Sequence, residues 1–518
     1  MFKRAARAGL LPGLVVSVVL IGAFVAPSRP TQLGPFSLAA ACYGAYPTCP
    51  APSVTSVSPN QGPVTGGTTV TITGTGFFNT TTSVMFGATA ATSFVVNSDN
   101  QITAVSPAHV VGTVDVTVTT ASGTSATSVN DQFRFLPTQP TLYNPRAPLR
   151  VLDTRMAFPL SPSEGNVWNL CLAGQVPSNA TAVVLNVTVT NGSDFSWLIV
   201  SPTGGTTPVV SNLNWVAGQT VANLVEVNLG TGQCVTINNA NGSVHVIADL
   251  EGWFAPPGAT TAGGFVPLVP ARVTDTRPGN SYPNSGLTLG AGTTRTVQIT
   301  GAGGVPATGV AAIVVNATVT NTSEFSWLTA FATGSSQPVA SNLNWSAGDT
   351  RANRIIVPVG TGGKVSFNNA NGSTDLIIDV NGYFTDATAS GSPNLGVAPS
   401  RILDTRNGTG GISNPVLGGT TIVVTVAGRG GVPTMGSATP PTAVVINVTA
   451  TNTYATPMSW LTIWPSLNTM PTASDLNFVS GQTVPNLVVV KVASDGTIKI
   501  NNANGQTDVL VDVAAWYG

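Results

Sequence analysis

One series of short strings recurs three times along the chain, each time in the same order. Each series opens with R-x-x-D-T-R, continues through S-W-L and S-N-L-N-W or S-D-L-N-F, reaches N-N-A-N-G and closes in an apolar run. The N-N-A-N-G strings begin at Asn238, Asn368 and Asn501, which gives spacings of 130 (368 − 238) and 133 (501 − 368) residues. Solenoid repeats are only about 20–50 residues long. This period therefore predicts three tandem copies of one domain, each able to bury its own core.

The copies are predicted to consist of strands. In the second copy we expect about eight short strands separated by Gly, Asn and Pro, which is typical of a β-sandwich or barrel. In "AIVVNATV" (312–319) apolar and polar residues alternate, so that Val315 faces one side of the strand while Val314 and Asn316 face the other. We expect the copies to span residues 142–256, 265–386 and 394–518.

The composition indicates β-domains with uncharged surfaces. Only 8% of residues are charged and the net charge is −1, whereas about 25% of residues are charged in an ordinary soluble protein. The chain has no electrostatic footprint for nucleic acid or for an anionic membrane. Its 56 Gly and 38 Pro favour strands and turns over helices. We expect no nucleic-acid partner and no cofactor.

The N-terminus carries an export pattern. Three basic residues within the first seven positions precede an apolar run over residues 10–25, and small residues follow at 39–41. This order indicates a secretory signal peptide over residues 1–41. An uncleaved N-terminal membrane anchor and lipidation at Cys42 are the alternatives. We expect the protein to be secreted or held at the cell surface.

Four cysteines are present: Cys42, Cys49, Cys171 and Cys234. An even number in an exported chain favours two disulfides. We favour Cys42–Cys49, within a short segment over residues 42–51, and Cys171–Cys234 within the first copy. Three connectivities are open, and no spacing matches a zinc site.

Residues 52–137 lie outside the repeat. They begin with "PSVTSVSPNQGPVTGGTTVTITGTGF" and contain "SVMFG" (83–87) and "VDVTVTT" (114–120). This order of alternating runs and glycines resembles the IPT/TIG family, immunoglobulin-like domains of cell-surface receptors, transcription factors and bacterial surface proteins. The resemblance implies a fold much more than a function, because the family serves as linker, dimerisation surface or ligand-binding domain.

The three copies resemble a domain that occurs in tandem in exported proteins of actinobacteria and related lineages. The R-x-x-D-T-R, Asn-Leu-Asn-aromatic and N-N-A-N-G strings carry this resemblance, which implies no established activity. The expected fold class is all-β, with an immunoglobulin-like β-sandwich followed by three tandem β-sandwich domains. Short linkers should join them as a string with limited flexing.

The R-x-x-D-T-R strings supply the main polar candidates. A bend after the Asp would let its carboxylate accept hydrogen bonds from backbone N–H groups or from the second Arg. Asn186 and Asp249 project from apolar strands and would need such donors, because a buried carboxylate without partners is costly. We favour a structural network, with an anion-binding site as the alternative. The cluster candidates are Arg150, Asp153, Arg155, Arg272, Asp275, Arg277, Arg401, Asp404 and Arg406.

Aromatic residues at matching positions more often fill a core than stack on sugars. Trp197, Trp327 and Trp460 form one such set, and we expect them in the core. Trp168 and Trp464 are unmatched and better suited to surface roles. The ligand-stacking candidates are Trp168, Trp215 and Trp345.

The N-N-A-N-G string lies between two strand-like runs, and Asn-Gly is the strongest short hairpin signal. We therefore expect a β-hairpin corner there that leads into the last strand. The string has no carboxylate for calcium, and we expect no metal site.

We expect the protein to be non-enzymatic. Its two histidines, His109 and His245, have no recognisable nucleophile context. We expect a secreted or cell-surface modular protein acting in adhesion, surface structure or presentation. The alternative is a carbohydrate- or cell-wall-binding protein with sugar sites on the repeats. A third hypothesis, a polysaccharide-degrading enzyme, requires two carboxylates about 5–10 Å apart. Expected partners are cell-wall or surface polysaccharide or other surface proteins, with self-association as a further hypothesis.

Overall fold

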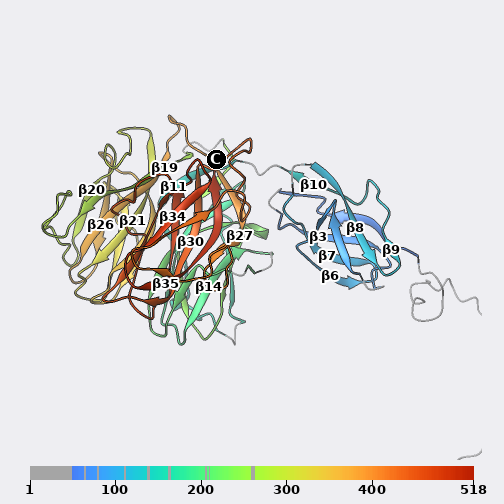
Figure 1. Ribbon diagram of the computed structural model, residues 1–518, viewed down its shortest axis with the longest axis horizontal. Coiled ribbons are helices and arrows are strands. Elements are labelled where there is room, and N and C mark those ends of the chain that lie inside the picture. Colours follow the sequence, from blue (N-terminus) through green and yellow to red (C-terminus); the bar gives the residue numbers. More distant parts are fainter. Residues whose placement is uncertain are drawn as a thin grey trace, which may run out of the picture. The chain divides into compact units, whose positions relative to one another are not determined.

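The computed structural model describes residues 50–63, 66–78, 81–109, 112–136, 140–161, 165–204, 207–208, 210–257 and 263–518. These residues are all-β, apart from single turns of 3₁₀ helix (Figure 1). The signal peptide predicted over residues 1–41 and the pair Cys42–Cys49 lie outside the described residues. Within the described ranges, no helix combines the length and the apolar character that crossing a bilayer requires.

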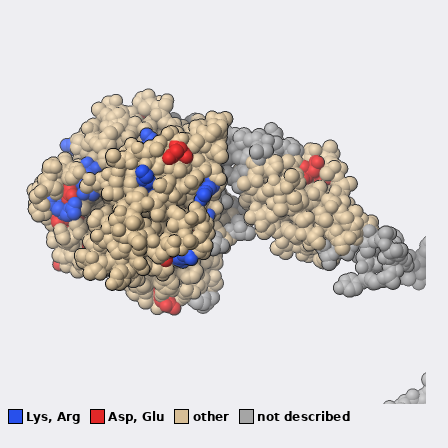
Figure 2. Space-filling model, in the orientation of Figure 1, with Lys and Arg blue, Asp and Glu red and all other residues tan. Residues whose placement is uncertain are grey.

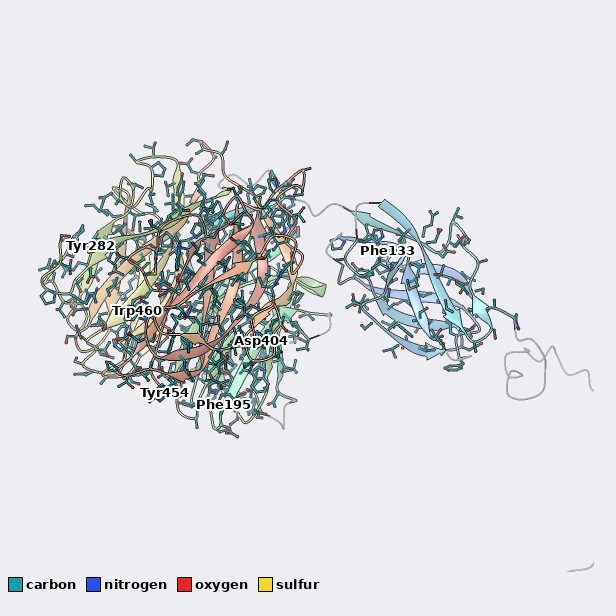
Figure 3. The ribbon with its side chains drawn as sticks, in the orientation of Figure 1. Phe133, Phe195, Tyr282, Asp404, Tyr454 and Trp460 are labelled. Atoms are coloured by element: carbon teal, nitrogen blue, oxygen red, sulfur yellow. A yellow bond between two sulfur atoms is a disulfide. The ribbon has the colours of Figure 1, made fainter. Side chains whose placement is uncertain are left out.

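The first module is a sandwich of two sheets around an aromatic core. Phe86 and Phe133 meet there edge to face, with ring centroids 5.2 Å apart, and Figure 3 labels Phe133. One sheet has the order β1-β3-β7-β6 and the other the order β2-β10-β8-β4-β5, with β9 beside β8. The strands are β1 (Ser53–Ser58), β2 (Gln61–Pro63), β3 (Thr69–Thr75), β4 (Ser83–Phe86), β5 (Thr89–Ala90), β6 (Ser93–Ser98), β7 (Gln101–Val105), β8 (Gly112–Thr120), β9 (Gly123–Thr124) and β10 (Gln132–Leu136).

The first repeat has two four-stranded antiparallel sheets, in the orders β11-β18-β13-β16 and β12-β17-β14-β15. This strand order is that of an eight-stranded jelly roll. Single 3₁₀ turns follow β11 (η1, Thr154–Met156) and precede β17 (η3, Thr231–Gln233). The strands are β11 (Leu142–Asp153), β12 (Val167–Cys171), β13 (Ala182–Thr190), β14 (Ser196–Pro202), β15 (Leu213–Trp215), β16 (Val221–Asn228), β17 (Cys234–Asn239) and β18 (His245–Ala255).

The second and third repeats have the same topology, with sheets β19-β26-β21-β24 and β20-β25-β22-β23, then β27-β35-β30-β33 and β29-β34-β31-β32. The second repeat comprises β19 (Phe265–Asp275), β20 (Thr294–Gln298), β21 (Val310–Thr320), β22 (Ser326–Ala332), β23 (Leu343–Trp345), β24 (Arg351–Pro358), β25 (Lys364–Asn369) and β26 (Asp375–Thr385). The third comprises β27 (Asn394–Asp404), β28 (Val416–Leu417) beside β35, β29 (Thr421–Thr425), β30 (Ala443–Tyr454), β31 (Ser459–Pro465), β32 (Leu476–Phe478), β33 (Val484–Lys491), β34 (Thr497–Asn502) and β35 (Gln506–Tyr517).

The three repeats share a core in addition to their own cores. On β13, Val183 and Leu185 face the interior of the first repeat, and Val184 faces the opposite way because side chains alternate along a strand. Val184 joins Val314 and Val445 of the other repeats in one buried apolar cluster. The strands that supply this cluster are drawn from teal to red in Figure 1. The expectation of a string of separate domains is therefore wrong for the repeats, because the outward sheet faces bury one another.

Asparagines connect the repeats in a closed cycle. Each repeat carries an Asn at the same position of its third strand, and its Nδ2 donates to the backbone carbonyl of a Ser in the next repeat. The third repeat donates in turn to the first, so every repeat is bonded to both others. The pairs are Asn186 with Ser341 (2.5 Å), Asn316 with Ser474, and Asn447 with Ser211 (2.6 Å).

The N-N-A-N-G string turns the chain, but it does not form a hairpin. Gly372 has a φ of 56°, a left-handed conformation that glycine adopts without strain. The flanking strands β25 and β26 belong to different sheets, so the string crosses from one sheet of the sandwich to the other. Ser326 of the S-W-L string donates to Asn369 (2.7 Å) and accepts from the Asn371 N–H (2.8 Å). The two recurring strings therefore recur together because they bond to each other.

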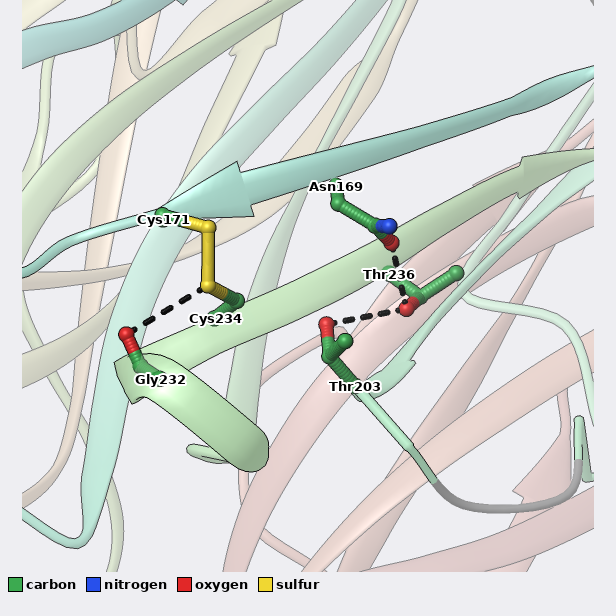
Figure 4. The surroundings of a disulfide bond; sticks show 6 residues. All are labelled: Asn169, Cys171, Thr203, Gly232, Cys234 and Thr236. Carbon is green, nitrogen blue, oxygen red and sulfur yellow. Dashed lines mark hydrogen bonds between the residues drawn. A yellow bond between two sulfur atoms is a disulfide. The ribbon is translucent and has the colours of Figure 1, made fainter.

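A disulfide joins Cys171 and Cys234 (Figure 4), which lie opposite each other on the paired strands β12 and β17. The bond closes a stretch with a sequence separation of 63 residues, and it confirms one of the two expected pairings. It is specific to the first repeat, because the other repeats carry no cysteine.

Candidate functional site

A groove lies where the first repeat meets the second; we call it groove 1–2. Its volume is about 490 Å³. The first repeat contributes Arg150, Arg155, Thr188, Thr190, Thr220 and Ile247. The second repeat contributes Phe325, Trp327, Thr329, Gln337, Pro338, Val339, Ala340, Ser341 and Asn344.

The junction of the second and third repeats forms an equivalent groove, groove 2–3, with a volume of about 450 Å³. Its residues occupy the same positions of the repeat, so the pair of grooves follows from the pseudo-symmetry of the fold. The second repeat contributes Arg272, Arg277, Thr318, Thr320, Thr350 and Ile377. The third contributes Met458, Trp460, Thr462, Met470, Pro471, Thr472, Ala473, Ser474 and Asn477.

The R-x-x-D-T-R strings form one wall of each groove. A shift in strand register between Arg150 and Leu152 interrupts the regular alternation and lets Arg150 reach Asp153 (3.1 Å) as well as Asp249. Arg150 binds Asp249 through Nε (2.5 Å) and Nη2 (3.2 Å). Arg155 binds Asp153 through Nε (2.9 Å) and Nη2 (2.6 Å). The arginine and aspartate candidates of the other two repeats make the same pairs.

Each wall contains two kinds of carboxylate, one with a lowered pKa and one with a raised pKa. Hydrogen bonds from Arg155 lower the pKa of Asp153 to about 2. Burial opposes ionisation of Asp275, but Arg277 more than offsets it and lowers the pKa of that carboxyl. Burial raises the pKa of Asp249, although Arg150 lowers it in part. In each wall two arginines balance two aspartates, so the wall is rich in donors and close to neutral overall.

Figure 2 shows that charged side chains are few on the visible face and that most of this surface is uncharged.

The opposite wall is aromatic and apolar. Ser326 and Leu328 are buried, whereas Trp327 between them points the other way and is half-buried at the groove. Phe325 is 50% exposed beside it, and Val339 is 83% exposed. In groove 2–3 the half-buried Trp460 (labelled in Figure 3) lies with Met458 and Met470.

Unused hydroxyl groups lie in the grooves. Thr188 and Thr318 are each 1% exposed, and neither Oγ1 has a hydrogen-bond partner among the residues that the structure describes. Both residues line their grooves. Asn344 of groove 1–2 likewise has an unpartnered Oδ1 within the described part of the chain. Buried polar atoms are normally paired, so these groups indicate a place for a ligand or ordered water to bind.

The aromatic candidates need correction. Trp215 and Trp345 are each 2% exposed and belong to the interior cores of the first and second repeats. They expose too little ring for a sugar to stack on. Trp464 is also buried, at 3% exposed, and donates to the Asn468 carbonyl (3.0 Å). Trp168, on β12, is 37% exposed, so its role as a ligand-stacking residue stays a prediction.

Trp327 and Trp460 were expected in the core, yet they form the groove walls. The sequence contained a signal for this placement. In S-W-L the Trp and the Leu are neighbours on a strand, so they point to opposite faces. With Leu328 in the core, Trp327 faces outward. The threonine hydroxyls carried no such signal, because only the packing of two repeats leaves them buried.

A comparison with protein families gave one match within the first module, at residues 52–135. Residues 52–135 are an IPT/TIG domain. The two-sheet sandwich described above agrees with this assignment. The match does not extend to the three repeats, for which the resemblance to an exported actinobacterial domain stays a prediction. A comparison with curated proteins found no match.

Solved structures with low overall similarity were also found. SGBP-B of the Bacteroides ovatus mixed-linkage glucan utilization locus, in complex with a heptasaccharide, is 13% identical with a TM-score of 0.14, and the alignment covers 37% of this chain and 50% of that chain. SGBP-B from a xyloglucan utilization locus of Bacteroides uniformis is 14% identical with a TM-score of 0.15, over 65% and 100%. A triple jelly roll protein from an archaeal virus is 11% identical with a TM-score of 0.16, over 73% and 91%.

Proposed function

We propose that the three repeats form a non-catalytic module of an exported protein, and that grooves 1–2 and 2–3 bind a neutral glycan. The observation that supports this most is the pairing of a half-buried Trp with an unpartnered buried Thr hydroxyl in both grooves. This carbohydrate-binding function was the alternative from the sequence. The geometry favours it over a purely structural role, because each groove combines a half-buried tryptophan with a buried hydroxyl that has no partner among the described residues.

The aromatic wall fits the apolar face of a pyranose ring. An exposed tryptophan face offers a large rigid surface on which a sugar can stack with little loss of side-chain entropy. Phe325 and Val339 extend this surface at groove 1–2. A mostly apolar site with a few placed polar groups is the general form of a small-ligand pocket.

The opposite wall fits sugar hydroxyls. Arg155 and Arg277 are 47% and 44% exposed, so parts of each guanidinium are open to a ligand. The threonine hydroxyls can both donate and accept. Since each arginine pair is balanced by two aspartates, the wall offers hydrogen bonds without a strong net positive charge. This balance favours neutral sugars over the anionic ligand that two arginines alone would suggest.

The carboxylates of the wall are poorly suited to glycoside hydrolysis. A general acid for that reaction needs a raised pKa and a free proton to donate. Asp153 and Asp275 instead have lowered pKa values, and each is bonded to two arginines. Burial raises the pKa of Asp249, but this carboxyl is fully buried and bonded to Arg150, so it is not open to a glycosidic oxygen. Binding without cleavage, followed by adhesion or retention at a polysaccharide surface, is the function that these carboxylates support.

Affinity electrophoresis of the intact chain through gels containing neutral polysaccharides would test this proposal. We expect at least one gel to retard the protein, and the double variant Trp327→Ala/Trp460→Ala to lower the apparent affinity by about threefold or more. Trp168→Ala is the matched control, because it removes an exposed tryptophan that lies outside the grooves. Retardation that survives the double variant but is lost with Trp168→Ala would place the site elsewhere. Absence of retardation in every gel would refute glycan binding.

A further inference from the structure

The first and last repeats meet in the same way as the other neighbours. We propose that their junction forms a third, equivalent glycan site, so that one chain carries three sites in a cycle. This inference rests on the proposed function and deepens it. The third site lies between the two repeats that are most distant in sequence. Its polar wall belongs to the third repeat and its aromatic wall to the first. The residues that define it are Arg401, Arg406, Thr449, Phe195 and Trp197.

The cyclic hydrogen bonds establish the equivalence. At the junction of the third and first repeats, Asn447 donates to the Ser211 carbonyl (2.6 Å), and Asn223 donates to Asn447 Oδ1 (3.0 Å). The junctions that form grooves 1–2 and 2–3 contain the same two bonds, with the second also at 3.0 Å in each. Two shared bonds at matching positions fix the same relative orientation of neighbouring repeats. The surfaces beside these bonds therefore face each other in the same way at all three junctions.

The third repeat supplies the polar wall. Arg401 binds Asp512 through Nε (2.7 Å) and Nη2 (2.9 Å), and Arg406 binds Asp404 while its side chain is 43% exposed. Thr449 is 2% exposed, and its Oγ1 has no partner among the described residues, as with Thr188 and Thr318. The same unpartnered hydroxyl thus occurs at all three junctions, as the equivalence of the three repeats predicts.

The first repeat supplies the aromatic wall. Trp197 is half-buried at the position of Trp327 and Trp460. Phe195 lies beside it, 47% exposed, with the ring centroids 6.4 Å apart. Ser211 and Trp197 belong to strings that line the other two grooves at the same positions. We therefore assign the third site the same class of ligand, a neutral glycan. One aromatic position differs: it holds Phe195 in the third site and Phe325 in groove 1–2, but Met458 in groove 2–3.

Counting bound ligands would test this inference. Native mass spectrometry of the intact chain, titrated in turn with cellohexaose, mannohexaose and a xyloglucan heptasaccharide, should show up to three bound copies of at least one oligosaccharide. Trp197→Ala should reduce the maximum to two, and Trp197→Phe should restore it, because an aromatic face remains. Thermal unfolding of both variants would verify that the fold is retained.

The outcomes separate the two proposals. A wild-type chain that binds two copies, with no change in Trp197→Ala, would overturn the third site and leave grooves 1–2 and 2–3 intact. A wild-type chain that binds none of the three oligosaccharides, and is retarded by no polysaccharide gel, would overturn the proposed function and this inference together. If Trp197→Ala fails to fold, the wild-type count and the Trp197→Phe count still decide between two and three sites.

Discussion

Each of the four fixed residues of R-x-x-D-T-R makes a different set of contacts. In the second repeat the first arginine, Arg272, binds Asp379 on the last strand, and Asp275 accepts the N–H of Arg277 at the turn (3.1 Å). Thr276 is fully buried and accepts the Leu376 N–H (2.8 Å), which ties the turn to the last strand. Only the second arginine is left with a large exposed surface. Three of the four positions therefore build the wall, and the fourth is the one best placed to contact a ligand.

The lowered pKa of Asp153 gives an acid-dependent contribution to stability. In the unfolded chain this carboxyl titrates near its ordinary value of about 4, but in the folded chain its pKa is about 2. The folded state therefore binds fewer protons in this interval. The contribution is present above about pH 4 and is lost as the pH falls to about 2. We expect Asp153→Asn to lose part of the decline in stability between pH 4 and pH 2, measured by urea unfolding. Parallel curves for both proteins would contradict this assignment.

At the level of elements, the polar face of one strand meets the next repeat. The alternation in β21 was readable from the sequence, including Asn316 and Thr318 on the face opposite Val315. What covers that face was not readable, because Asn and Thr suit solvent as well as an interface. The same applies to N-N-A-N-G, whose turn residues were recognised. The expected pairing of its two flanking strands in a hairpin was wrong, because strand pairing in a jelly roll is set by contacts distant in sequence.

The repeats differ at one interface position in a way that offers an internal control. Arg354 of β24 is fully buried and binds Asp475 of the third repeat (2.7 Å). Leu224 and Leu487 occupy the position of Arg354, and Asn212 and Asn342 that of Asp475. The second and third repeats are thus joined by a buried ion pair where the other repeats use an amide and a leucine.

We expect Arg354→Leu to destabilise the fold by about 3–5 kcal/mol, because it leaves the Asp475 charge buried without a partner. The double variant Arg354→Leu/Asp475→Asn reproduces the combination found in the other repeats and should recover most of that loss. Chemical unfolding of the wild type, both single variants and the double variant forms a complete cycle. A double variant no more stable than Arg354→Leu would show that the ion pair is not the reason for the loss.

At the level of the whole molecule, the third repeat contacts the first, so that the three repeats form a closed cycle. Glu226 of the first repeat accepts hydrogen bonds from Asn394 (2.6 Å) and Tyr517 (3.2 Å) of the third. Burial raises the pKa of Glu226 to about 7, with both hydrogen bonds acting in the opposite direction. The contact between the two ends of the repeat array therefore contains a carboxyl group that titrates near neutral pH.

This group should make the fold less stable as the pH rises. The unfolded chain releases the proton near pH 4.5, but the folded chain keeps it until about pH 7. Stability should therefore fall between about pH 4.5 and pH 7, by roughly 3 kcal/mol in total from this group. Glu226→Gln should remove that slope while keeping the side-chain shape. The measurement is the unfolding free energy at pH 5 and pH 8; an equal slope in both proteins would contradict the role of Glu226.

The central claim is that the junctions between repeats bind glycan. Hydrogen–deuterium exchange of the intact chain, with and without a saturating concentration of an oligosaccharide that binds in the native mass spectrometry titration, tests this claim most directly. We expect protection in the segments that line the grooves, around residues 325–345 and 458–478 and in the R-x-x-D-T-R turns, with the IPT/TIG domain unchanged. Protection confined to the IPT/TIG domain or to the strand that carries Trp168, with the junctions unaffected, would contradict the account.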